Sequence, residues 1–313
     1  MGMKTNKMGL CFKNMWVLLI GVVSVFIACN NVIDQGFTDK AEAKNEMVNG
    51  LKEGKWIEYG NYGSIFLLPD STAPIYVLTI YKAGKPVGVS HGYSKDGKFY
   101  CEIPYINGEV NGIMKIYDDN GKLQWENPFV NGKENGVEKS FFEDGKLAQE
   151  TPYINGIKNG IEYVYFDKGG NVDLEFPYEN GKLNGVEKDY YGNGKLRKEI
   201  PYKYDSINGV EKDYYESGKI MSEIPYSDNK QNDTTKSYYE SGSLMSRSIF
   251  KNSNEEVSEE YYENGKLKSR SNYRGDEGTT MEYYKNGKLK SKSSFDGVKE
   301  MIINYDSTSK EIK

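Results

Sequence analysis

The sequence predicts an all-β protein, an elongated antiparallel meander of tandem β-hairpins that each take about 24 residues. Composition supports this class, because 34 Gly and 27 Tyr among 313 residues, with a mean hydropathy of −0.73, favour many short strands over one large apolar core. Two periodic patterns agree with it. Glycines followed by Lys or a similar residue recur every 22 to 25 positions, at Gly97, Gly121, Gly145, Gly170, Gly194, Gly218, Gly242, Gly265 and Gly287. Aromatic residues keep the same step, at Tyr105, Phe129, Tyr153, Tyr178, Tyr202, Tyr226, Phe250, Tyr273 and Phe295.

The amino-terminus has the features of a secretory leader. Lysines precede the charge-free apolar stretch 15–28, which is shorter than the roughly 20 residues that a spanning helix needs. Small Ala28 before Cys29 resembles a bacterial lipobox, although Phe26 stands where leucine is usual. The resemblance implies a lipoprotein signal peptide over 1–28 and lipidation of Cys29, with the mature chain anchored to a membrane of the bacterial envelope, at the outer membrane or the surface. An ordinary signal peptide cut near Ala28 is the alternative.

The segment after the leader divides into two parts. Residues 29–48 are polar with few large apolar groups, and we expect a flexible tether there. Residues 49–80 contain an aromatic-rich run, 54–59, and an apolar run, 65–68, and are predicted to form a degenerate first repeat or cap. Tandem repeats then occupy 81–313. Terminal repeats are expected to be atypical because they shield an open sheet edge.

One clear copy, residues 185–202, defines the predicted hairpin. Asn193-Gly194 is typical of a two-residue turn, in which both residues adopt positive φ. With this turn, Lys188 lies opposite Glu199, and a slightly longer glycine-rich connection joins successive hairpins. The register also opposes Tyr191 with Leu196, Tyr190 with Arg197, Asp189 with Lys198 and Val186 with Pro201.

The same register predicts charge pairing in the other copies. It opposes Lys212 with Glu223, Lys139 with Glu150 and Lys115 with Glu126. Each such pair contributes about 0.2–1 kcal/mol and disfavours a slip of register. Each repeat should advance the sheet by about 10 Å, since it adds two strands. Neither predicted face is wholly apolar, so a single layer in water on both sides and a sheet rolled onto itself both remain open.

The block from Tyr261 to Ser269, with its paired aromatics and Asn-Gly turn, resembles the MORN repeat variant. The resemblance covers about 81–305 and implies a surface for interactions. This variant is found in bacterial proteins of the YwqK antitoxin type, which implies a protein that binds and neutralises a partner toxin. The leader departs from that role, because it sends the chain out of the cytoplasm.

Charge and composition exclude several classes of function. The chain has 41 Lys+Arg and 46 Asp+Glu; without residues 1–29, which hold three lysines, 38 basic groups face 46 acidic ones, a net charge of −8. This balance argues against nucleic acid as a partner. His91 is the only histidine, and after lipidation Cys101 is the only free thiol, which excludes an internal disulfide. A series of near-identical groups does not supply an active site, so no catalytic, cofactor or metal residue is assigned.

Tyrosines are the best candidates for contact with a partner, since they offer a large rigid surface and a hydroxyl group. The alternative is that they stabilise a thin sheet. The candidates are Tyr190, Tyr191, Tyr214, Tyr215, Tyr238, Tyr239, Tyr261 and Tyr262. We therefore predict a non-catalytic, membrane-anchored repeat scaffold that binds an unidentified protein in the cell envelope. An antitoxin or immunity protein, and a protein that binds or acts on envelope carbohydrate, are the alternatives.

Overall fold

A computed structural model describes residues 34–60, 67–68, 73–251, 253–275 and 277–312. The leader and Cys29 lie outside the described residues. Within them the chain forms 30 β-strands and one short 3-10 helix, η1 (Lys40–Glu42). No helix in these ranges is long and apolar enough to cross a membrane.

The strands begin with six that precede the regular repeats: β1 (Glu46–Val48), β2 (Leu51–Gly60), β3 (Leu67–Leu68), β4 (Ile75–Lys82), β5 (Lys85–Ser94) and β6 (Phe99–Ile106). The regular repeats follow as β7 (Glu109–Val110), β8 (Gly112–Tyr117), β9 (Leu123–Val130), β10 (Lys133–Glu134), β11 (Gly136–Phe141), β12 (Leu147–Ile154), β13 (Ile157–Lys158), β14 (Gly160–Tyr165), β15 (Val172–Glu179), β16 (Lys182–Leu183), β17 (Gly185–Tyr190), β18 (Leu196–Lys203), β19 (Ser206–Ile207), β20 (Gly209–Tyr214), β21 (Ile220–Ser227), β22 (Lys230–Gln231), β23 (Asp233–Tyr238) and β24 (Leu244–Lys251). The last strands are β25 (Asn254–Tyr261), β26 (Leu267–Arg274), β27 (Glu277–Tyr283), β28 (Leu289–Phe295), β29 (Glu300–Tyr305) and β30 (Glu311–Ile312).

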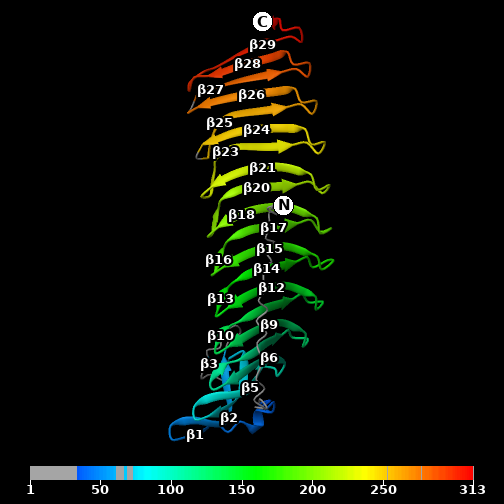
Figure 1. Cartoon of the computed structure of the whole chain (residues 1–313). Helices are drawn as coiled ribbons and strands as arrows, with labels where there is room; N and C mark the ends of the chain where they lie inside the picture. Colours follow the sequence, from blue (N-terminus) through cyan, green and yellow to red (C-terminus); the bar gives the residue numbers. More distant parts are fainter. Residues whose placement is uncertain (1–33, 61–66, 69–72, 252, 276, 313) are drawn as a thin grey trace, which may run out of the picture. The chain divides into compact units, whose positions relative to one another are not determined.

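Strand pairing follows chain order. For example, β17 pairs with β18, and β18 pairs with both β19 and β20, always antiparallel. Figure 1 shows the hairpins following one another in this way from β5 to β29. The predicted antiparallel meander of tandem hairpins is therefore confirmed.

The predicted register is right in the middle of each hairpin and wrong beside its turn. Lys188 pairs with Glu199 as expected, and so do the three charge pairs of the other copies. A β-bulge next to Tyr190, however, places Leu196 opposite it instead of Arg197. Only Gly194, at φ +80°, has positive φ in this turn, so the turn is longer than the two-residue type, which needs two such residues.

The two-residue turns lie between the hairpins instead, where the sequence predicted the longer connection. Asn131 and Gly132 have φ of 50° and 74°, the pattern of a type I′ turn. Tyr204 and Asp205 adopt the same conformation without a glycine, at 49° and 69°. The sequence did not separate the two turns because Asn-Gly pairs occur in both.

A glycine and a proline from adjacent strands make one packing unit in each of five successive repeats. Gly136 has φ +128°, and a Cβ there would lie 2.8 Å from Cγ of Pro128. Asn135 N donates to Pro128 O at 2.9 Å, which anchors the chain against the ring. Equivalent units are Gly112 with Pro104, Gly160 with Pro152, Gly185 with Pro177, and Gly209 with Pro201. These glycines are distinct from the turn glycines such as Gly145, which have no atom near a Cβ.

A tether was expected over 29–48, and the described part of this segment packs on the first strands. In its described part, 34–48, the side chain of Phe37 is buried, and its carbonyl oxygen lies 3.2 Å from Nδ1 of His91. Strand β1 pairs with β2, and Asn45 Oδ1 accepts from Ile57 N at 2.9 Å. One buried aromatic and a few polar contacts are enough to pack this segment on the first strands. The buried apolar residues of the described chain are Phe37, Ala73, Ile75, Val77, Leu78, Tyr81, Cys101 and Ile103.

Candidate binding surfaces

Directly paired residues point to the same face of a sheet, so the registers assign side chains to two faces. The charged face carries Lys188, Glu199 and their equivalents, and the pocket face carries Ile200, Tyr202 and their equivalents. The charged face holds a row of paired side chains that crosses the repeats. This charge row comprises Glu102, Lys115, Glu126, Lys139, Glu150, Tyr163, Glu175, Lys188, Glu199, Lys212, Glu223, Lys236, Arg247, Glu259 and Arg270.

Ion pairs along the charge row are mostly half exposed. Lys188 Nζ lies 3.2 Å from Glu175, and Lys139 Nζ lies 3.4 Å from Glu150. Surface pairs of this kind are worth no more than about 1 kcal/mol each. Their main effect is on register, since a slip of one residue would move every charge to the other face.

The first tyrosine of each candidate pair donates its hydroxyl to the charge row. Tyr190 donates to Glu175 at 2.8 Å, and Tyr214 donates to Glu199 at 2.7 Å. Burial and this bond to a carboxylate raise the pKa of Tyr214 to about 12. The same contact is made by Tyr238 to Glu223 and by Tyr261 to Glu259.

The second tyrosine of each pair bridges to the next hairpin. Tyr191 donates to the carbonyl oxygen of Tyr214 at 2.6 Å, 23 residues along the chain. Equivalent bonds run from Tyr215 to Tyr238, from Tyr239 to Tyr261 and from Tyr262 to Tyr283. All eight candidate tyrosines are half-buried, and each hydroxyl is hydrogen-bonded within the sheet. These contacts support the stabilising role; partner contact stays a prediction.

Exposed aliphatic side chains form a second row on the charged face. We call Ile113, Val137, Ile161, Val186 and Val210 the apolar stripe; each pairs directly with the repeat proline of the next strand. These side chains are between 42% and 50% exposed, once per repeat over five successive repeats. Sequence reasoning missed the stripe, although the recurrent Gly-Val or Gly-Ile pair was a signal for it. Exposed apolar groups arranged contiguously mark interaction sites.

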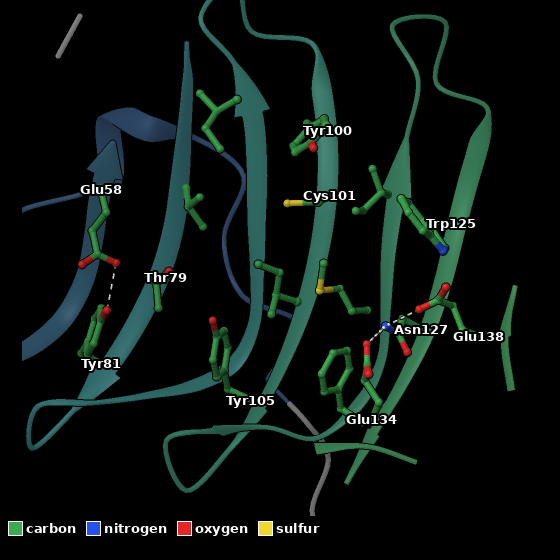
Figure 2. A pocket seen from close by; sticks show the side chains of 16 residues that line it. Glu58, Thr79, Tyr81, Tyr100, Cys101, Tyr105, Trp125, Asn127, Glu134 and Glu138 are labelled. Atoms are coloured by element: carbon green, nitrogen blue, oxygen red, sulfur yellow. Dashed lines mark hydrogen bonds between the residues drawn. The ribbon is translucent and has the colours of Figure 1, made fainter. Parts of the chain in front are cut away.

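A cavity of about 370 Å³ lies on the pocket face near the N-terminal end of the repeats. Its apolar walls come from β4, β6, β8 and β9, including Ile75, Val77, Ile103, Met114 and Phe129. Glu58 of β2, Glu134 of β10 and Glu138 of β11 also line it (Figure 2). Strand β5 lies between β4 and β6.

The residues of β5 on the same face are small, which explains the hollow. Gly88, Ser90 and Gly92 lie opposite Tyr105, Ile103 and Cys101. Because β5 sends no large side chain to this face, space remains between the walls on either side. The alternation of small residues over 88–92 was the available signal in the sequence.

The two ends of the cavity differ in their polar contacts. At one end Glu58 is matched by donors, since it accepts from Tyr81 at 2.9 Å and pairs with Lys52. Figure 2 shows the other end, where Asn127 lies between Glu134 and Glu138.

At this second end one amide serves two carboxylates. Asn127 Nδ2 donates to Glu134 at 2.8 Å and to Glu138 at 3.0 Å. Asn127 Oδ1 is buried and has no hydrogen-bond partner. Burial raises the pKa of Glu138, and the nearby charge of Glu134 adds to this, whereas a hydrogen bond from Trp125 lowers it. No lysine or arginine is among the residues that line the cavity in the described part of the chain.

Two reactive residues noted in the sequence are placed in structural roles. Burial raises the pKa of the Cys101 thiol to about 12, so the thiol stays protonated at neutral pH. His91 lies beside the Phe37 carbonyl oxygen. Over the described ranges, no group of three His, Cys, Asp or Glu side chains is arranged to hold a metal ion.

Comparison with known proteins gives one informative match. The family model described as "MORN repeat variant" matches seven segments: 110–131, 134–155, 183–204, 207–228, 234–252, 257–274 and 276–296. No curated protein matches the chain.

Solved structures with a partial match to this chain include two that contain TccC3. The crystal structure of TcdB2-TccC3 is 12% identical with a TM-score of 0.16, over 76% of this chain and 16% of that one. The Tc holotoxin pore of Photorhabdus luminescens, with a substituted TccC3, is 11% identical with a TM-score of 0.17, over 77% and 15%. The chain thus spans about a sixth of these chains, and TM-scores so low carry no argument. The seven family matches, by contrast, coincide with the hairpins described above, and the chain is therefore a β-hairpin repeat protein in which seven segments match the MORN repeat variant.

Proposed function

We propose that this protein is a non-catalytic scaffold that binds a partner protein along its charged face. The observation that carries this proposal is the apolar stripe. It repeats one exposed aliphatic side chain per hairpin, so a partner meets the same contact about every 10 Å. Burial of each half-exposed Val or Ile side chain contributes about 1 kcal/mol to the free energy of binding. Several of them must be buried together before this gain exceeds the free-energy cost of association.

The other side chains of the repeats support binding more than chemistry. The tyrosine hydroxyls are bonded to carboxylates and carbonyls, and the Cys101 thiol is protonated. Such groups hold the surface in one shape, which lowers the entropy lost when a partner binds.

The test uses full-length protein with a photo-crosslinker and envelope extracts as the source of partners. Val137, Ile161 and Val186 are replaced by serine singly and together, with Ile302→Ser and Ile303→Ser, on the distant strand β29, as exposed aliphatic controls outside the stripe. Capture should weaken stepwise with each stripe substitution and be unchanged in the controls. Loss of all capture at one position, or equal effects of stripe and control variants, would contradict the proposal.

We place the scaffold in the bacterial envelope, attached through a lipid at Cys29. The support is the lipobox-like sequence at Ala28-Cys29, after an apolar stretch of signal-peptide length. Palmitate labelling should mark the wild-type protein and not Cys29→Ala. Mass spectrometry of the mature amino-terminus separates lipidation from simple cleavage near Ala28.

An antitoxin or immunity protein is the second candidate, and the MORN repeat variants favour it because of their resemblance to YwqK-type proteins. It predicts a toxic neighbouring gene whose effect is relieved by co-expression of a form without residues 1–28. If the variant with all three stripe substitutions no longer relieves the toxicity, the apolar stripe would be the surface that binds the toxin, and both candidate functions would hold. Absence of any toxic neighbour would leave the scaffold alone.

A further inference from the structure

The cavity on the pocket face has an excess of acceptors at one end. Glu134 and Glu138 each accept a hydrogen bond from Asn127 Nδ2, and Glu138 also accepts one from the Trp125 side chain. Asn127 Oδ1, buried beside them, accepts nothing. A buried acceptor without a donor is costly, and two ionised carboxylates that accept from the same amide nitrogen repel each other. Satisfying this end therefore requires donors and positive charge.

We infer that this cavity is a binding site for a basic side chain of a partner peptide, an arginine flanked by apolar residues. The guanidinium supplies several N–H donors in a planar fork, which suits two carboxylates and an amide oxygen. The apolar walls, with Ile103, Met114 and Phe129, receive the neighbouring apolar side chains.

The position of Trp125 supports the choice of arginine. Its side chain lines the cavity and is 44% exposed, an unusual state for tryptophan. Guanidinium groups stack on aromatic faces, and Trp and Arg are enriched among the residues that contribute most to binding at protein interfaces. Figure 2 shows Trp125 on the same side of the cavity as Asn127 and Glu138.

Nearby positive charge is already engaged elsewhere. Lys158, which acts on Glu138 through its charge, is bonded to Glu162. Lys52 is paired with Glu58 at the opposite end. Counting Glu134, Glu138, Glu162 and Lys158, the acceptor end keeps a net charge of about −2 when its carboxylates are ionised.

This site does not depend on the proposed function. It lies on the face opposite the apolar stripe and is confined to one part of the sheet, whereas the stripe repeats. A partner bound through the stripe should still be captured when the cavity is altered. Conversely, the cavity should still bind a peptide when the stripe residues are serine.

The experiment measures binding of acetyl-Leu-Arg-Leu-amide to full-length protein. Trp16→Phe and Trp56→Phe leave Trp125 as the single tryptophan of the chain, so its fluorescence reports on the cavity. The comparison ligand replaces arginine by citrulline, which has almost the same shape and no charge. The arginine peptide should bind about tenfold more tightly, the usual worth of a charge-assisted hydrogen bond.

Variants test whether Glu134 and Glu138 cause the preference for the arginine peptide over the citrulline peptide. Glu134→Gln with Glu138→Gln should abolish the preference for arginine and keep the weaker binding of both peptides. Glu187→Gln is the matched control, because Glu187 holds the position of Glu138 two hairpins further on and burial also raises its pKa. This control should keep the preference.

Several outcomes would overturn the inference. One is equal affinity for the arginine and citrulline peptides in the wild type, and another is no fluorescence change with either peptide at about 5 mM. Agmatine binding as tightly as the peptide would make the ligand a small amine. Self-association that is lost in the double glutamine variant would make the occupant a second copy of the chain.

Discussion

The glycine–proline unit makes a quantitative prediction about stability. Gly209 has φ +130°, and a Cβ at this position would lie 2.9 Å from Cγ and 3.2 Å from Cβ of Pro201. Because the proline ring is closed onto the backbone, it cannot move aside as a flexible side chain would. The substitution Gly209→Ala therefore meets both a disfavoured backbone conformation and a steric collision.

The magnitude follows from these two costs. A non-glycine residue in this backbone region costs about 1–3 kcal/mol, and overpacking of one methyl group costs about 1–3 kcal/mol. The alanine also restricts the unfolded chain, which offsets about 0.4–1 kcal/mol. We expect Gly209→Ala to lower the free energy of unfolding by about 2–4 kcal/mol.

Urea unfolding followed by circular dichroism measures the effect. Because repeat arrays can unfold in parts, hydrogen exchange of the Asn208 amide, which donates to Pro201 O at 2.9 Å, reports the local change. Gly192→Ala is the control, since Gly192 has no positive φ and no atom near a Cβ.

A double substitution separates the two costs. Adding Pro201→Ala to Gly209→Ala should relieve the steric collision and leave the backbone strain in place. The effects of the two substitutions on the free energy of unfolding should therefore differ from additivity by about 1 kcal/mol or more. If Gly209→Ala stays within about 0.5 kcal/mol of Gly192→Ala, the reasoning about this unit is wrong.

Three further predictions concern side chains. Tyr215→Phe should destabilise the protein by about 1 kcal/mol in urea unfolding, since it removes the 2.7 Å bond to the Tyr238 carbonyl; an unchanged midpoint would contradict this. Hydrogen bonding from Arg247 lowers the pKa of Glu259, so this carboxylate stabilises the fold above its unfolded pKa of about 4.3 and loses that effect as pH falls through the folded pKa. The stability difference between wild type and Glu259→Gln should therefore shrink below about pH 4, and a difference independent of pH would refute it. With the other two cysteines replaced by serine, Cys101 should resist iodoacetamide at pH 8 until urea unfolds the chain, because its pKa is raised to about 12.

The sequence alone determined the hairpins and the middle of their register. Paired residues such as Lys188 and Glu199 lie only eleven positions apart, so both the turn between them and their charges are visible in one stretch of sequence. Local spacing carries this information because strand side chains alternate strictly and an antiparallel pair is closed by a nearby turn. The repeat then copies the result along the chain.

Only the tertiary structure revealed the features that depend on contacts with a neighbouring strand or a neighbouring repeat. The bulge at Tyr190 and its bond to Glu175, fifteen residues earlier, required the neighbouring hairpin in place. The cavity required small residues on β5 between large ones on β4 and β6, and the packing of Phe37 near His91 joined positions 54 residues apart. Such features form where side chains of several strands pack together on one face of the sheet. The side-chain pattern of a single strand does not show which neighbours it will meet there.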